Sequence, residues 1–312
     1  MIEHLLKEHP RPQMLSVPVR RRVRALKQLQ TKFVESEAKF FREVHLLECK
    51  FENKAFPLME RRKEIISGLS EPTEEEASKF PDDISMLAWE IDPKEITPDL
   101  KGIPYFWYTV LRSIPVMADM ISPVDEPILK CLTDIRSNVT MDPMSFRLEF
   151  EFLPNDYFKN KILYKNYFLK CEPNADSPFE FDGSEIYKCE TGKIDWKPGK
   201  NVTIKTVMKK QRHRTGSNIR TVTKTVQVRS FFNFFNIPRE DAEEDALDKG
   251  HAYDYEIATY LRERVIPRAV LYFTGEAFAE ESDSGEEAVY ETDKDHDVEE
   301  EKSASDSELE SE

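Results

Sequence analysis

The N-terminal part of the chain has a long pattern of apolar residues at helical spacing. Residues 19–56 contain neither Gly nor Pro. Their apolar positions recur mostly at steps of three or four, the spacing of one face of an α-helix, with one step of seven across Ser36 and Glu37. We therefore predict a single long helix up to Pro57, which should kink or end it, and a shorter helical segment from there to Gly68.

This predicted helix is too long for its own domain to cover. At 1.5 Å per residue its uninterrupted part would be roughly 55 Å long, more than the diameter of a domain of this size. Pairing with the same helix of a second copy would bury the apolar stripe and give a homodimer. The alternative is a long helix that lies across its own domain. The residues predicted to form the dimer contact are Val23, Leu26, Phe33, Phe40, Val44, Leu47 and Phe51.

A second pattern, with a period of two, begins at Phe146 and is typical of a strand with one face in water. Four apolar residues from Phe146 to Phe152 alternate with three charged ones. Further strands are expected at 162–169, 202–208 and 222–228, in the order of an antiparallel meander.

Helical patterns precede and follow these strands. An aromatic-rich segment that begins at Gly102 predicts a core helix, and a second helix should run from Asp125 to about Ile135. Ile257, Leu261 and Val265 share one face of a last helix. Together the patterns predict an α+β fold: a long helix, followed by a four-stranded antiparallel β-sheet with helices on one face.

The charge of the chain is concentrated at its C-terminal end. The formal net charge is −15, and residues 276–312 contain 17 Asp or Glu against two Lys. Residues 1–275 contain equal numbers of acidic and basic residues. Such a tail buries too little apolar surface to offset its ordering entropy, so we expect it to be disordered and to bind something basic, histones first. A tail that serves only solubility or autoinhibition is the alternative.

The predicted hairpin at 205–229 has the opposite charge. Residues 197–239 contain 11 Lys or Arg and no Asp or Glu. A nuclear-import signal is the favoured interpretation, ahead of a merely solvated hairpin that resists edge-to-edge pairing. Nucleic-acid binding is the weakest, because the net charge repels a duplex and no aromatic residue interleaves the basic centre. That centre contains Lys209, Lys210, Arg212 and Arg214.

Catalytic, metal-binding and membrane signals are not found. No apolar run reaches 18 residues, and the N-terminus lacks a stretch typical of a signal peptide. The four Cys show neither metal spacing nor close pairing, which indicates reduced thiols of the cytosol or nucleus. Gly199-Lys200 resembles part of a phosphate loop, but Asn201 stands where Ser or Thr should bind magnesium. We therefore expect no enzyme, no metal and no cofactor.

Taken in order, several segments resemble the nucleosome assembly protein family of histone chaperones. The N-terminal extension departs from the family pattern, because it is short and lacks an acidic block. The segments that carry the resemblance include 15–30 (LSVPVRRRVRALKQLQ), 102–107 (GIPYFW), 146–152 (FRLEFEF), 194–203 (IDWKPGKNVT), 230–235 (SFFNFF) and, most distinctive, 266–277 (IPRAVLYFTGEA).

The resemblance implies an earmuff-like α+β domain and a homodimer joined through the long helix. It implies a chaperone that binds core histones, as dimers and as the tetramer, shields them from non-specific DNA and promotes nucleosome assembly. It further implies shuttling between nucleus and cytoplasm with the help of an import receptor. No membrane and no sequence-specific nucleic acid is expected as a partner. The chain would divide into a short extension (1–16), the dimerisation helix and a short following helix (17–68), the histone-binding domain (69–275) and the acidic tail (276–312).

Individual residues can be proposed for these roles. Four tail serines each precede an acid by three residues, the preference of acidophilic kinases. An acidic inhibitor of an enzyme such as a phosphatase, or a scaffold, is the alternative function. The candidate histone-binding acids are Asp119, Asp125, Glu126, Asp134, Asp241, Glu243, Glu244, Asp245, Glu299, Glu300 and Glu301, and the candidate phosphorylation sites are Ser284, Ser303, Ser305 and Ser307.

Overall fold

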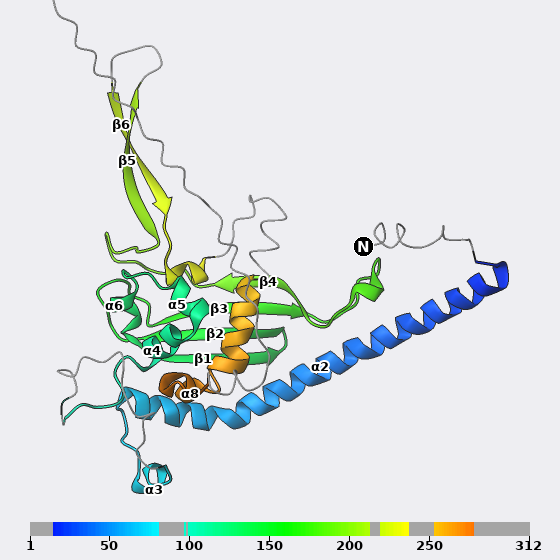
Figure 1. Cartoon of the computed structure of the whole chain (residues 1–312), viewed down its shortest axis with the longest axis horizontal. Coiled ribbons are helices and arrows are strands. Elements are labelled where there is room, and N and C mark those ends of the chain that lie inside the picture. The colour runs from blue at the N-terminus through cyan, green and yellow to red at the C-terminus, as the bar shows by residue number, and fades with distance from the viewer. Residues whose placement is uncertain (1–14, 81–96, 98, 213–218, 237–252, 278–312) are drawn as a thin grey trace, which may run out of the picture.

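The structure is a computed structural model that describes residues 15–80, 97, 99–212, 219–236 and 253–277 (Figure 1). Its first element is α2, Val17–Ser67, a continuous helix of 51 residues. Of the two outcomes predicted at Pro57, a kink or an end, the end is wrong, because α2 continues for ten residues beyond it. The ribbon of α2 is bent rather than straight (Figure 1). The helix ends at Gly68, which takes a left-handed conformation with φ 70°, as helix C-termini commonly do.

In the described residues, four short α-helices lie between α2 and the first strand of the main sheet. They are α3 (Glu74–Ala77), α4 (Phe106–Ser113), α5 (Pro115–Met120) and α6 (Glu126–Leu129). The aromatic helix predicted after Gly102 is confirmed as α4, whose Trp107 is fully buried. The helix predicted at 125–135 is wrong beyond Leu129, because the chain enters a strand at Leu132.

The main sheet has four antiparallel strands in the order β1-β2-β3-β4. Their bounds are Leu132–Met141, Met144–Phe152, Ile162–Lys170 and Glu185–Thr191. The α+β class and the four-stranded sheet are confirmed, whereas two of its members were predicted wrongly. Strands β5 (Ile204–Arg212) and β6 (Ile219–Gln227) pair only with each other. The apolar residues of β6 do not alternate, so β6 has no apolar face to place on the core.

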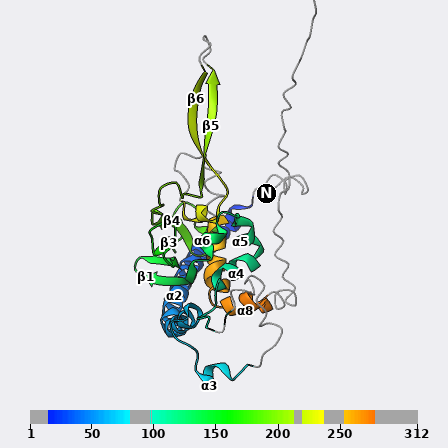
Figure 2. The same ribbon diagram turned by 90° about the vertical axis from the view of Figure 1, so that its left-hand side faces the viewer.

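Helices cover one face of the sheet, and the β5–β6 hairpin projects away from it (Figures 1 and 2). The covering elements include α4 to α6, the 3₁₀-helix η3 (Phe231–Phe235), residues 253–260, the π-helix η4 (Leu261–Val265) and α8 (Ala269–Thr274). The predicted inner face of the last helix is confirmed, since Ile257, Leu261 and Val265 are buried. Aromatic rings fill the layer between helices and sheet; Phe150, for example, packs edge-on against Phe231, Phe234 and Phe235.

Lys165 of β3 is a charged side chain inside this apolar layer. It is 1% exposed. Its Nζ donates to the carbonyl of Phe234 at 2.7 Å and to Asp254 at 2.6 Å, and Tyr167 donates to the same carboxylate at 3.0 Å. A buried ammonium is tolerated only with such partners. These bonds of Lys165 join η3 and the helical residues 253–260 to strand β3 of the sheet.

Candidate functional site

Polar side chains fasten α2 to the edge strand β1. Glu52 accepts hydrogen bonds from the Ser137 hydroxyl at 2.8 Å and from the backbone N–H of Val139. Further along the helix, Glu60 pairs with Arg136 at 2.6 Å. An edge strand has unpaired backbone groups that invite pairing with other chains. Here α2 satisfies at least one of them, and the contact fixes the direction in which the helix leaves the domain.

His45 extends the contact between α2 and β1 to the π-helix η4. The residue is 3% exposed, and its Nε2 lies 2.8 Å from the carbonyl oxygen of Thr140. Its Nδ1 lies 3.4 Å from Glu48, whose carboxylate is also 3.4 Å from Arg262 of η4. Both ring nitrogens face oxygens that only accept hydrogen bonds, so the doubly protonated imidazolium fits this position. The hydrogen bond with Glu48 is the main cause of a raised pKa at His45, and burial opposes it.

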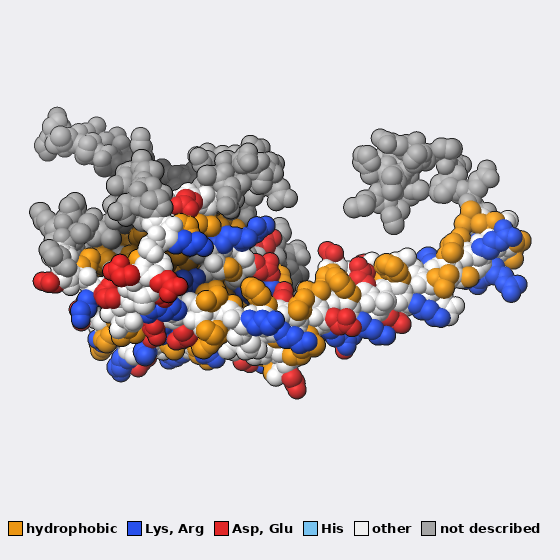
Figure 3. Space-filling view, turned by 90° about the horizontal axis from the view of Figure 1, so that it is seen from below, with side chains coloured by type: hydrophobic (Ala, Val, Ile, Leu, Met, Phe, Trp, Pro, Cys, Tyr) orange, Lys and Arg blue, Asp and Glu red, His pale blue; other side chains and the backbone are white. Residues whose placement is uncertain are grey.

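Another face of α2 is left uncovered. Five of the seven residues predicted to form the dimer contact have exposed fractions between 59% and 67%: Leu26, Phe33, Phe40, Leu47 and Phe51. The other two, Val23 and Val44, are half-buried. Leu29 and Leu58 extend this exposed stripe, with 60% and 72% exposed. Figure 3 shows hydrophobic side chains along α2 well beyond the domain. Exposed apolar surface of this extent is typical of a protein interface.

The chain does cover a different part of α2. Val34 and Ala38 are buried, and the Cys171 thiol, just beyond β3, lies 3.3 Å from the carbonyl oxygen of Ala38. Phe41 packs edge-on against Phe181, which lies in the connection to β4. On this face, α2 therefore lies across its own domain, as in the alternative interpretation. The exposed stripe is the apolar surface of α2 that the chain leaves uncovered.

Two of the predicted histone-binding acids are part of the core. Asp125 is fully buried and accepts four hydrogen bonds, from the N–H and hydroxyl of Ser122, the hydroxyl of Ser230 and the N–H of Phe231. Asp134 is 2% exposed and pairs with Arg136. The sequence shows two acids next to predicted helices but cannot show these partners. Burial corrects the prediction, because neither carboxylate can reach a second protein.

The remaining candidate acids keep their status as predictions. Asp119 is exposed and Glu126 is half-buried. The other seven lie outside the described residues: Asp241, Glu243, Glu244, Asp245, Glu299, Glu300 and Glu301.

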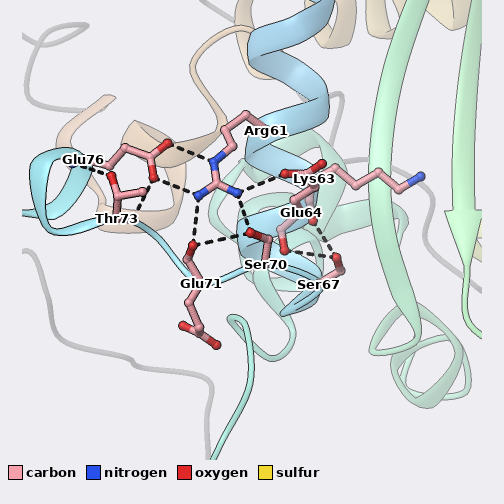
Figure 4. Close-up of polar contacts among 8 residues, drawn as sticks. All are labelled: Arg61, Lys63, Glu64, Ser67, Ser70, Glu71, Thr73 and Glu76. Atoms are coloured by element: carbon pink, nitrogen blue, oxygen red, sulfur yellow. Dashed lines mark hydrogen bonds and ion pairs between the residues drawn. The ribbon is translucent and has the colours of Figure 1, made fainter.

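An acidic turn at the end of α2 presents further carboxylates. Arg61 holds it from the helix: its guanidinium donates to Glu76 at 2.8 and 2.9 Å, to Ser70 at 3.0 Å and to the carbonyl of Glu71 at 2.9 Å (Figure 4). Arg61 is the main cause of a lowered pKa of about 2 at Glu76. The arginine that fixes this turn was not identified from the sequence.

The predicted import segment lies at the far end of the hairpin. Lys209, Lys210 and Arg212 belong to strand β5, and Arg214 lies outside the described residues. The four candidate phosphorylation sites, Ser284, Ser303, Ser305 and Ser307, also lie outside them.

A metal site and a membrane-spanning helix are both absent from the described residues. No group of three His, Cys, Asp or Glu there could hold a metal ion. No described helix combines the length and apolarity needed to cross a membrane.

The described residues define an α+β protein with a helix-covered antiparallel sheet, a long helix with an exposed stripe and a projecting hairpin. A family model described as "Nucleosome assembly protein (NAP)" matches residues 21–276. The chain belongs to the nucleosome assembly protein family.

Individual relatives agree with this assignment. Human nucleosome assembly protein 1-like 4 is 45% identical over 287 residues, which cover 86% of this chain and 76% of that protein. Mouse nucleosome assembly protein 1-like 1 is 47% identical over 279 residues, covering 85% and 71%. Among solved structures, nucleosome assembly protein 1 from Plasmodium knowlesi matches with a TM-score of 0.52 and 28% identity, over 84% of this chain and 99% of that one.

Replacing Asp125 should destabilise the fold. The change Asp125→Ala removes the acceptor of four hydrogen bonds and leaves buried donors on Ser230 and Phe231 unpaired. We expect a loss of about 3 kcal/mol in the free energy of unfolding, measured in urea. The control Asp119→Ala, at an exposed acid, should change it by less than about 0.5 kcal/mol. Equal effects of the two changes would contradict the structural role of Asp125.

The contact around His45 should weaken as the pH rises. The pKa of His45 is raised from 6.5, so its contribution to stability is fully present below pH 6.5 and is lost as the pH rises through the raised pKa. Glu48, whose pKa is lowered from 4.5, loses its contribution only below that value. From about pH 6 to about pH 8.5, the free energy of unfolding should fall more for the wild type than for His45→Gln, which still donates to Thr140 but does not titrate. Parallel curves for the two proteins would contradict this assignment.

Proposed function

We propose that this protein is a histone chaperone that works as a homodimer, binds core histones and prevents their non-specific adsorption to DNA. The observation that carries the proposal is the extent of the family match. It covers the body of the chain from residue 21 and ends at residue 276, where the acidic tail begins. The relatives matched over the same region bear names that describe nucleosome assembly.

The charge distribution supports this function. A chaperone must compete with non-specific histone–DNA complexes and still release histones to the nucleosome. Many weak contacts meet this requirement, because each exposed ion pair is worth roughly 1 kcal/mol or less and is screened by salt. The tail of 17 acids against two lysines supplies such contacts. It would also raise the local concentration of a basic partner and the rate of association. No catalytic activity is part of the proposal.

The subunit interface would be the exposed stripe of α2. Five large side chains more than half exposed on one helix face form an apolar surface that a second copy could bury. The bonds between α2 and β1 would then hold each domain at a fixed angle to the shared helix pair.

The basic hairpin would serve traffic into the nucleus. It projects from the domain (Figures 1 and 2), so an import receptor could bind Lys209, Lys210, Arg212 and Arg214 without contacting the sheet. Shuttling between cytoplasm and nucleus would follow. Phosphorylation at Ser284, Ser303, Ser305 or Ser307 would add about −1.5 to −2 charges per site and strengthen the acidic tail.

The direct test is a fluorescence titration of labelled histone dimer at physiological salt, with DNA as competitor. A chaperone should remove histone from non-specific DNA and leave assembled nucleosomes intact. Binding no better than that of a polyglutamate of equal charge would reject the proposal and favour an acidic regulator.

Removing the tail should weaken histone binding and make it less sensitive to salt. A chain that ends at Gly275 loses 17 acids and two lysines but keeps every described element up to Thr274. Fewer charges then contribute to the screened attraction. We expect affinity for the histone dimer to fall about tenfold or more, with a shallower dependence on salt, in the same titration. Unchanged affinity and slope would exclude the tail from the mechanism.

Polar substitutions in the stripe should dissociate the dimer. Phe33 and Phe51 are 64% and 67% exposed in the single chain. Because a buried phenylalanine contributes about 3 kcal/mol or more, the pair Phe33→Ser and Phe51→Ser should raise the dimer dissociation constant at least about a hundredfold, measured by sedimentation. The control change, Phe80→Ser, replaces an exposed phenylalanine outside α2 and should leave it unchanged. A dimer that persists in both variants would place the interface elsewhere.

A further inference from the structure

The free end of α2 has an unusual charge. Arg20, Arg21, Arg22, Arg24 and Lys27 lie within its first 11 residues, and all are exposed. Cations at a helix N-terminus oppose the helix dipole. The ion pairs found among the described residues involve neither Arg22 nor Lys27. Blue side chains gather at this end of the helix, far from the domain (Figure 3).

The opposite end of α2 holds an acidic segment. Arg61 fixes residues 70–76 against the helix (Figure 4), and Thr73 and Glu76 close a capping box that begins α3. Glu71, Glu74 and Glu75 are exposed. None of the ion pairs of the described residues uses their carboxylates.

The exposed stripe relates the two ends to one another. Leu26 and Leu58 are equally far from position 42 of the sequence, and so are Phe33 and Phe51. Two copies of α2 that pair in opposite directions about this position would set Leu26 opposite Leu58 and Phe33 opposite Phe51, whereas Leu29, Phe40 and Leu47 would lie level with Ala55, Val44 and Glu37. Residue 22 of one copy then lies level with residue 62 of the other, and residue 27 with residue 57.

The basic residues and the acidic segment would also face one another. Arg22 precedes Leu26 by four residues, and Arg61 follows Leu47 by 14, or two heptads. Such spacings keep residues on nearly the same helix face. The stripe therefore has basic residues at one end and the acidic segment at the other. In the antiparallel pair, Arg61, which fixes the acidic segment, lies level with the basic residues of the other copy.

We propose that Arg22 of one copy forms ion pairs with the acidic segment Glu71–Glu75 of a second copy, at both ends of the paired helices. This inference rests on the proposed homodimer and specifies its partner residues. Antiparallel pairing brings the unlike charges together twice per dimer. Parallel pairing would place five cations against five cations. The charges would thus select both the direction of pairing and the partner chain.

A charge-swap experiment in trans tests the contact. One variant carries Arg22→Glu; the other carries Glu74→Lys and Glu75→Lys. Each homodimer would meet like charges at both ends, and its dissociation constant should rise about tenfold or more at low salt. A mixed dimer would regain unlike charges at both ends. Native mass spectrometry of an equimolar mixture should therefore show clearly more mixed dimer than the random half, and the excess should disappear at high salt.

Two further measurements separate the possible failures. The matched control Arg24→Glu makes the same change in charge at the same end, on the side of α2 away from the stripe; mixed with the Glu74→Lys and Glu75→Lys variant, it should give the random distribution. If the wild type forms dimers but the charge-swapped mixture is random, the ion pairs are refuted and the homodimer stands. If the wild type sediments as a monomer, the homodimer itself is refuted.

Discussion

The structure depends on the contact between α2 and the edge of the sheet. No fifth strand among the described residues pairs with the edge strand β1. A purely apolar helix face packed against β1 would leave its backbone groups buried without partners. α2 supplies a carboxylate at Glu52 and an imidazole at His45 instead. Because the face of α2 toward β1 is polar, the apolar stripe must point in another direction. The exposed stripe is thus a geometric consequence of how the helix is attached.

Elements with one pure periodicity could be predicted from the sequence. The helical stripe from Val19 onward, the alternation at Phe146–Phe152 and the last helix all keep one face apolar, and the structure has a helix, a strand and a helix there. Strand β1 was missed because its environment is mixed. Thr133 bonds to β2, Arg136 bonds to α2, and Asp134 and Arg136 bond to each other. The residues of β1 therefore do not alternate between a solvent-exposed polar face and a buried apolar face.

The candidate acids show the other limit of sequence reasoning. Whether an acid is a surface charge or a structural acceptor depends on residues far along the chain. Asp125 is satisfied by Ser230 and Phe231, more than 100 residues later. In the sequence, Lys165 interrupts an apolar strand, but the carbonyl of Phe234 and the carboxylate of Asp254 offset the cost of burying its ammonium group. Neither pairing has a local signal. The exposed stripe could be predicted because its cause, the length of one helix, is local.

This limit changes where histone contacts can be sought. Many acids of the body are committed to the fold: Glu48, Glu52, Glu60, Asp125, Asp134 and Glu151 all bond to the chain itself. An acid already paired with a cation offers little further attraction, since a histone lysine would have to displace that partner. Under the proposed function, the charge available for a basic protein would therefore lie in acids such as Asp119, which forms none of the ion pairs of the described residues, and in the 17 acids beyond residue 275. A folded body joined to a strongly acidic tail would then separate the two tasks of shape and charge. The body would set geometry through contacts that salt hardly affects, whereas the tail would supply an attraction that salt, phosphorylation or a competing polyanion changes.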